Sequence, residues 1–218
     1  MMVSAYAMRL RLTLASVPAD NGTELSAALE ALGLIALRGK VVTADALHCN
    51  RRTVAAINAK GGDWCLALKA NQDSLLSDAR SCFGKMKEGH PVANIEEVNH
   101  GRKESRTVVV VSAKGLAEHH EFPGLEAFGR VEATREVDVK KTSDIRYFAL
   151  SWTPTPEVLM FTVRAHWEIE NALHWQLDVS FAKTPHAIER TTPPLASLSC
   201  EDALSMSSDA MHQRALSP

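Results

Sequence analysis

Imidazole and carboxylate side chains recur at every fourth position in a late segment of the chain. The row consists of His166, Glu170, His174 and Asp178. A helix turns by about 100° per residue, so this spacing predicts that the four side chains share one helical face. Charged and polar groups beside a buried face are costly to desolvate unless something compensates them. The pattern therefore indicates a divalent-metal site on a long helix, expected over about residues 156–180.

Asp45 is a second candidate metal ligand, because it directly follows the apolar run from Val41 to Ala44. That run is predicted to be a buried strand, and α/β sheets place their sites at the carboxyl ends of strands. Glu170 would be its partner, since two carboxylates can hold a divalent ion and oxygen ligands favour Mg²⁺ or Mn²⁺ over zinc. Two such ions about 3.5–4 Å apart can catalyse phosphoryl transfer. The alternative role of Asp45 is that of a helix cap or loop residue.

The elements that must position these residues alternate between strand and helix in the first half of the chain. The predicted helices begin at residues 23, 51, 73 and 156, with Asp73 as the expected N-cap of the third. The predicted strands cover two segments within 3–17, then 41–44, 64–68, 106–112, 129–137 and 145–151. This order predicts an α/β fold with a partly parallel sheet covered on both faces, followed by a more antiparallel, β-rich segment.

The composition excludes several classes of protein. The 218 residues have a net charge of −2 and 45% hydrophobic content, which suits one folded core and gives no global sign of nucleic-acid binding. The four cysteines lack the spacing of a structural zinc site or a disulfide framework. No apolar run approaches the ~18 residues of a membrane span, and the N-terminal segment is a poor signal peptide because it contains Arg9 and Arg11. A cytoplasmic location is therefore expected.

Positive charge is concentrated locally. Arg51 and Arg52 are adjacent, and Arg102 and Arg106 lie close together in the β-rich segment. These four residues are the candidates for contact with DNA phosphates. Ordinary surface charge is the alternative for the first pair, and support of the fold is an equally good one for the second.

Four ordered blocks indicate a family. They cover residues 41–48, 63–72, 100–106 and 164–179. Together they resemble the DDE transposases of bacterial insertion sequences, in the branch that includes the H-repeat-associated proteins. The resemblance spans about residues 2–181.

This resemblance implies an RNase H-like core, a mixed sheet flanked by helices, with a β-rich insertion before the last long helix. It implies metal-dependent cleavage and strand transfer at transposon ends, with double-stranded DNA as the partner, Mg²⁺ or Mn²⁺ as the cofactor and a homo-oligomer as the assembly. Three carboxylates would do this work. The motifs identify Asp45 as the second and Glu170 as the third, with Glu168 as the competing choice for the third.

Further residues match characteristic positions of the resemblance. On the late helix they are His166, Asn171, His174 and Asp178; in a loop near the site they are Lys69, Asn71 and Gln72. Helix packing explains the first group equally well, and the loop residues are expected to approach phosphate. A zinc hydrolase built on His166, Glu170 and His174 is a weaker alternative, because three ligands in one helical row need a fourth from elsewhere.

The chain departs from the family pattern in two places. Residues 1–19 contain no Asp or Glu, so the first carboxylate and the family's first, central strand are expected to lie upstream of Met1, as in a truncated copy. Such a gap would leave two strand edges unpaired. The expected organisation is an incomplete core over 1–90, the insertion over 91–154, the catalytic-type helix over 155–181 and a loosely ordered tail over 182–218.

Two functions are compatible with these observations. The first is a transposase-derived domain for metal-dependent DNA cleavage and strand transfer, inactive as it stands because a carboxylate is missing. The second is a non-catalytic remnant that binds DNA or a full-length transposase.

Overall fold

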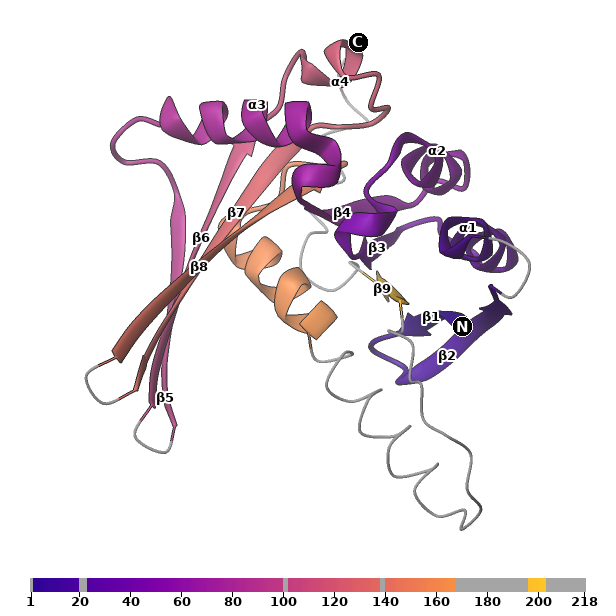
Figure 1. Cartoon of the computed structure of the whole chain (residues 1–218), viewed down its shortest axis with the longest axis horizontal. Coiled ribbons are helices and arrows are strands. Elements are labelled where there is room, and N and C mark those ends of the chain that lie inside the picture. Colours follow the sequence, from indigo (N-terminus) through magenta and orange to yellow (C-terminus); the bar gives the residue numbers. More distant parts are fainter. Residues whose placement is uncertain (1, 20–22, 100–101, 138–139, 168–195, 203–218) are drawn as a thin grey trace.

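One mixed sheet runs through the molecule (Figure 1). The computed structural model describes residues 2–19, 23–99, 102–137, 140–167 and 196–202. Within these ranges the sheet has nine strands in the order β2-β1-β9-β3-β4-β8-β7-β6-β5. The strands are β1 (Met2–Ala7), β2 (Leu12–Pro18), β3 (Lys40–Ala44), β4 (Asp63–Leu68), β5 (Val92–Asn99), β6 (Arg102–Ser112), β7 (Ala127–Val137), β8 (Lys140–Leu150) and β9 (Ala196–Asp202).

Helices connect and cover these strands. They are α1 (Glu24–Leu34), α2 (Arg51–Ala59), α3 (Asp73–Gly84), the short α4 (Leu116–His119) and a helix over residues 156–167, here called the late helix. Two short 3₁₀ turns, η1 (Ala46–His48) and η2 (Ala70–Gln72), follow β3 and β4. None of the helices in the described ranges is both long enough and apolar enough to span a membrane.

The sheet mixes parallel and antiparallel pairs, which confirms the predicted α/β class and the partly parallel sheet. β3 pairs in parallel with β4, and β1 pairs in parallel with β9. β4 then pairs antiparallel with β8, and the remaining strands continue as antiparallel neighbours out to β5. Figure 1 shows β5–β8 leaving the rest of the sheet as a long twisted ribbon.

Alternating side chains of the central strands enter two different cores. On β3, Val42 packs in the core that also holds residues of α1, α2 and α3, whereas Val41 packs in the core of the late helix. On β4, Trp64 packs in the core with α1, α2 and α3, and Cys65 packs in the core of the late helix. Successive residues of a strand point to opposite faces, so both faces of these strands are covered, as the apolar runs predicted.

The local signals located most elements correctly, with two corrections. Thr23 caps α1, with its side chain accepting from the Ser26 amide, as its position predicted. The predicted N-cap of α3 was wrong: Gln72 takes that position, and Asp73 is the first helical residue. β5 was not predicted, because its central residues include Asn94, Glu96 and Glu97 and give only a weak strand pattern.

β9 is the main departure from expectation. It lies between β1 and β3 and hydrogen-bonds to both, so it occupies the place in the sheet where unpaired edges were expected. The expected loose order of residues 182–218 is therefore wrong for Ala196–Asp202. The rest of that tail lies outside the described residues, and the proposed division at residues 90, 154 and 181 stays a prediction.

Gly129 on β7 sets how closely the late helix approaches the sheet. A Cβ at this position would collide with Cδ2 of the fully buried Leu159. We expect Gly129→Ala to lower the free energy of unfolding by about 1–3 kcal/mol, because a packed core resists added volume. In a Leu159→Ala background the same substitution should cost less, since the truncation opens space.

Urea unfolding of both single variants and the double variant measures this coupling. Gly84→Ala is the matched control, because a Cβ there meets nothing within 4 Å, and it should leave stability unchanged or slightly raised. Penalties for Gly129 and Leu159 that add to within about 0.5 kcal/mol would contradict the close contact.

Candidate functional site

Asp45 lies at the carboxyl end of β3, at the start of η1. It occupies the N-cap position, but its side chain makes no capping hydrogen bond there. The side chain is 49% exposed. The helix-cap alternative therefore does not account for this carboxylate, which remains accessible to a ligand from solvent.

The late helix brings His166 to Asp45. His166 Nε2 lies 3.9 Å from Asp45 Oδ1, and His166 Nδ1 is hydrogen-bonded to Thr43 Oγ1 at 3.1 Å. His166 is almost fully buried. Asp45 and His166, which lie 121 positions apart in the sequence, thus come together in the structure. The hydrogen bond with Thr43 fixes the orientation of the His166 ring.

The surroundings of Asp45 favour its ionised form. The pKa of Asp45 is lowered, mainly by the interaction with the His166 side chain and further by the charges of His166, Lys69 and His48, against an opposing effect of burial. Lys69 is exposed and begins the turn that follows β4. A carboxylate that stays charged near neutral pH is suited to hold a cation.

Of the three predicted loop residues, Asn71 has a clear structural contact. Its Nδ2 donates to the carbonyl of Ala46 at 2.6 Å, which ties η2 to η1 directly beside Asp45. Gln72 serves as the N-cap residue of α3. Asn71 therefore supports the backbone of the site, and its expected contact with phosphate stays a prediction.

His48 and Glu24 also belong to this site, although no role was predicted for either. His48 is fully buried, and its Nε2 lies 3.5 Å from Glu24 Oε1, while neither ring nitrogen has a hydrogen-bond partner among the described residues. Burial lowers the pKa of His48, and the negative charge of Asp45 opposes this effect without cancelling it. Burial and the charge of Asp45 both raise the pKa of Glu24. His48 stood in a family block, but Glu24 carried no sequence signal beyond its place at the start of a helix.

The remaining predicted residues of the late segment lie outside the described residues. They are Glu168, Glu170, Asn171, His174 and Asp178. Their assignment as metal ligands or supporting residues therefore stays a prediction.

Arg106 is neutralised within the β-rich segment. Its guanidinium contacts Glu97 at 3.1 Å and Glu104 at 3.0 Å, and only 18% of its side chain is exposed. Glu97 also receives a 2.7 Å contact from Arg164 of the late helix. This arrangement favours the fold-support alternative for Arg106; the side chain of Arg102 lies outside the described set.

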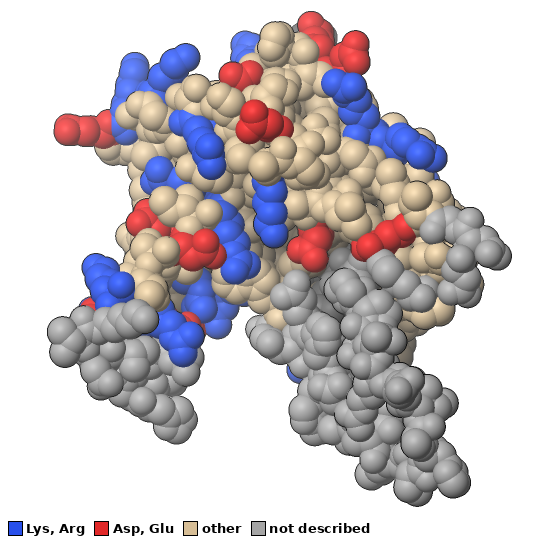
Figure 2. All heavy atoms as spheres, viewed as in Figure 1, with Lys and Arg blue, Asp and Glu red and all other residues tan. Residues whose placement is uncertain are grey.

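The other two basic candidates differ from each other. Arg51 donates two hydrogen bonds to the carbonyl of His120 and lies 3.5 Å from Glu121. Arg52 is exposed on α2. Figure 2 shows acidic and basic side chains interspersed over the visible face, which is consistent with the net charge of −2.

The buried His48 predicts a pH dependence of stability. The unfolded chain binds a proton at His48 near the ordinary pKa of 6.5, whereas the folded chain, with a lowered pKa, resists it. The unfolded state thus binds more protons as the pH falls through this range, and stability should fall with it.

We therefore expect the unfolding free energy of the wild type to fall as the pH is lowered from about 7.5 to 5.5. His48→Gln should make the unfolding free energy depend less steeply on pH, whether or not it changes the unfolding free energy at about pH 7.5. Urea unfolding at both pH values, in the presence of a chelator, measures the two slopes. Equal slopes in the wild type and the variant would contradict a buried neutral His48.

Comparison with known proteins places the chain among transposases. A family model described as "Transposase DDE domain" matches residues 2–186. The chain is 28% identical over 187 residues to the "H repeat-associated putative transposase YhhI" of Escherichia coli strain K12, covering 81% of this chain and 50% of that protein. It is 32% identical over 159 residues to an "Uncharacterized protein in dhlA 3'region" of Xanthobacter autotrophicus, covering 71% of this chain and 54% of that protein. The chain thus spans about half the length of these relatives.

A solved structure, that of the sugar N-methyltransferase KedS8 from Streptoalloteichus sp ATCC 53650, is 14% identical over 51% of this chain and 38% of that one, with a TM-score of 0.21. This similarity is too low to inform the fold or the site. The family model covers most of the chain, and the relative YhhI, which also matches most of it, is named as a putative transposase. The chain belongs to the DDE transposases of insertion sequences, in the branch of the H-repeat-associated proteins.

Proposed function

We propose that this chain is a transposase-derived domain whose Asp45 site serves metal-dependent DNA cleavage and strand transfer at insertion-sequence ends. The observation that carries the proposal is the placement of Asp45. It ends a central strand, it is half exposed, and His166 of the late helix lies 3.9 Å away from it. Family membership supplies the reaction class, because DDE transposases act on DNA by phosphoryl transfer.

Asp45 and Glu170 would hold the metal. Oxygen ligands of this kind favour Mg²⁺ or Mn²⁺. When bound, such an ion stabilises the charge that develops on the phosphate oxygens. Glu170 follows His166 by four residues in the sequence, the spacing that places two side chains on one helical face. His166 and Lys69 would keep Asp45 ionised and oriented, and Asn71 would hold the backbone beside it.

We further propose that the fold is an RNase H-like core. The run β2-β1-β9-β3-β4 supports this, since the antiparallel pair β1-β2 and the parallel pair β3-β4 lie on either side of a central place, where the resemblance puts the family's first strand. The strands β5–β8 would be the insertion that precedes the late helix. The partner would be double-stranded DNA, and the working assembly a homo-oligomer.

In the part of the chain that the structure describes, the central place beside Asp45 supplies no counterpart of the family's first carboxylate. The central place next to β3 is taken by β9, and the register pairs Leu198 with Ala44, directly before Asp45. Ala196 and Ser197 therefore lie near that end of β3. The acidic residues of β9 pair with Lys40 and Val41, at the opposite end. The second candidate function, a non-catalytic remnant that binds DNA or a full-length transposase, is favoured by this observation.

Metal titration tests the site. We expect Mn²⁺ or Mg²⁺ to bind the wild type in an isothermal titration and Asp45→Asn to weaken binding by about tenfold or more, because a charged oxygen ligand is lost. Asp144→Asn is the control, since Asp144 is exposed and paired with Arg146 in the β-rich segment. Equal affinities of the wild type and Asp45→Asn would rule out this metal site.

A strand-transfer assay tests whether this chain can catalyse joining by itself. Purified wild-type chain, supplied with Mg²⁺ and DNA that carries the transposon ends, should give no joined product if the first carboxylate is absent. Joining at Mg²⁺ concentrations that saturate the site, abolished in Asp45→Asn, would instead show that the chain is a complete catalyst.

DNA binding distinguishes the exposed Arg52 from the largely buried Arg106. We expect Arg52→Ala to weaken DNA binding and to lower the salt dependence by about one phosphate contact, because Arg52 is exposed on α2. Arg106→Ala should leave DNA affinity unchanged and instead lower stability, because it leaves Glu97 and Glu104 less compensated. Fluorescence anisotropy at several salt concentrations, with urea unfolding beside it, measures both effects. A larger loss of affinity for Arg106→Ala than for Arg52→Ala would contradict this assignment.

A further inference from the structure

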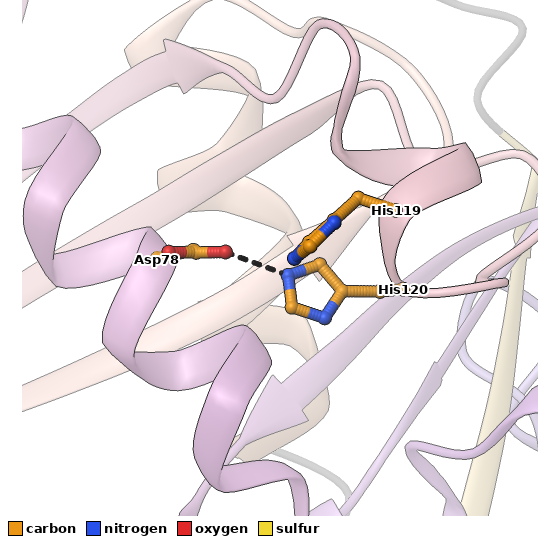
Figure 3. Close-up of side chains that lie close together, drawn as sticks. All are labelled: Asp78, His119 and His120. Atoms are coloured by element: carbon orange, nitrogen blue, oxygen red, sulfur yellow. Dashed lines mark hydrogen bonds and ion pairs between the residues drawn. The ribbon is translucent and has the colours of Figure 1, made fainter.

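A histidine-rich cluster lies at the corner where α3 meets the short helix α4. The donor atoms of Asp78, His119 and His120 lie within 4.8 Å of one another. Asp78 belongs to α3, His119 is the last residue of α4, and His120 caps it. Figure 3 shows the three side chains directed toward the same point. The cluster shares no residue with the Asp45 site.

The cluster is held in place before any ligand binds. His120 is 8% exposed, and its Nε2 lies 2.8 Å from Asp78 Oδ2. Its backbone is fixed from two directions, because the His120 amide donates to the carbonyl of Leu116 and Arg51 donates two hydrogen bonds to the His120 carbonyl. The ring of His119 meets the ring of His120 edge-on, with centroids 4.8 Å apart. A preorganised set of donors loses little freedom when it binds a ligand.

The type of donor selects the ligand. Two imidazole nitrogens and one carboxylate oxygen suit a divalent transition metal, whereas Mg²⁺ prefers an all-oxygen shell. Three protein ligands with an open fourth position are a common arrangement for zinc. Ligand atoms about 2.0–2.1 Å from a tetrahedral zinc ion lie about 3.3 Å apart. The contact between His120 and Asp78 would therefore open by about half an ångström, which the partly exposed Asp78 side chain allows.

We propose that Asp78, His119 and His120 form a binding site for zinc that clamps α3 to the α4 segment. His120 would be the buried anchor, Asp78 the charge-compensating ligand and His119 the ligand that closes the site from the solvent side. Water would take the fourth position. Because the ligands come from two elements joined by the β5–β6 hairpin, binding would stabilise the folded chain.

Zinc titration of the untagged chain tests the proposal. The protein is first stripped with a chelator, and Zn²⁺ affinity is measured in competition with a chromophoric chelator, with Co²⁺ absorption as a probe of tetrahedral geometry. We expect saturable one-to-one binding that persists in millimolar Mg²⁺. His119→Gln should weaken it by about tenfold or more, since an exposed ligand is lost while the fold is kept.

Two further variants control for neighbouring groups. Glu118→Gln removes an exposed charge beside the site, and Cys82→Ser removes the thiol one helical turn from Asp78; both should bind zinc as the wild type does. Zinc at a fixed concentration should also raise the melting temperature of the wild type by more than that of His119→Gln. The proposal is overturned if the wild type shows no saturable binding, if His119→Gln binds as tightly as the wild type, or if Cys82→Ser loses the binding instead. Asp45→Asn should leave zinc affinity unchanged, which separates this site from the proposed magnesium site.

Discussion

The hydrogen bond between Thr43 and His166 joins the middle of the sheet to the late helix, and the candidate site depends on it. Val41 and Thr43 of β3 face the late helix, because alternate residues of a strand point to the same side. Asp45 is the next residue in that alternation, directly beyond the strand end. His166 can therefore contact the strand through one ring nitrogen and approach the carboxylate with the other. The same contact that orients the helix also sets the electrostatic environment of Asp45.

Packing against the β-rich segment keeps the late helix at this position. Leu159, Met160 and Val163 fill a core with residues of β6, β7 and β8, and Gly129 gives Leu159 the space to approach. At the far end of the described helix, Trp167 lies over the guanidinium groups of Arg106 and Arg146, with centroid distances of 5.7 Å and 4.7 Å. The ribbon of strands thus supports the helix that reaches the site. Changes in β7 would act on Asp45 through this helix although they do not touch it.

Charge is distributed differently at the two candidate metal sites. Around Asp45, the interaction with the His166 side chain and the charge of Lys69 favour the ionised carboxylate, and a hard cation would meet oxygen ligands there. At the corner of α3 and α4, the donors are mainly imidazole nitrogens, which suit a softer ion. The two sets of ligands differ in chemistry, so the sites would discriminate between metals by ligand type.

The sequence by itself determined most of the local elements and the family, and it singled out Asp45 and His166 as candidate site residues. Capping residues and apolar periods act over a few residues, which is why Thr23 marked the start of α1. Gly61, at a φ of 68°, follows the end of α2 for the same local reason, since glycine adopts this backbone conformation without strain. The motif blocks added Asp45 and His166, because their order along the chain is specific to the family. These features need no knowledge of distant contacts.

Only the tertiary structure decided which distant groups meet. β9 entered the sheet between β1 and β3, where its backbone pairs with both neighbouring edges. Its alternation of Ala196, Leu198 and Cys200 with polar residues fits a strand, but a strand pattern does not say which edges the strand will pair with. His48 met Glu24, Arg106 met two glutamates, and His120 met Asp78 across 42 positions of sequence. Periodicity and spacing describe one element at a time, and contacts between elements depend on how the whole chain packs.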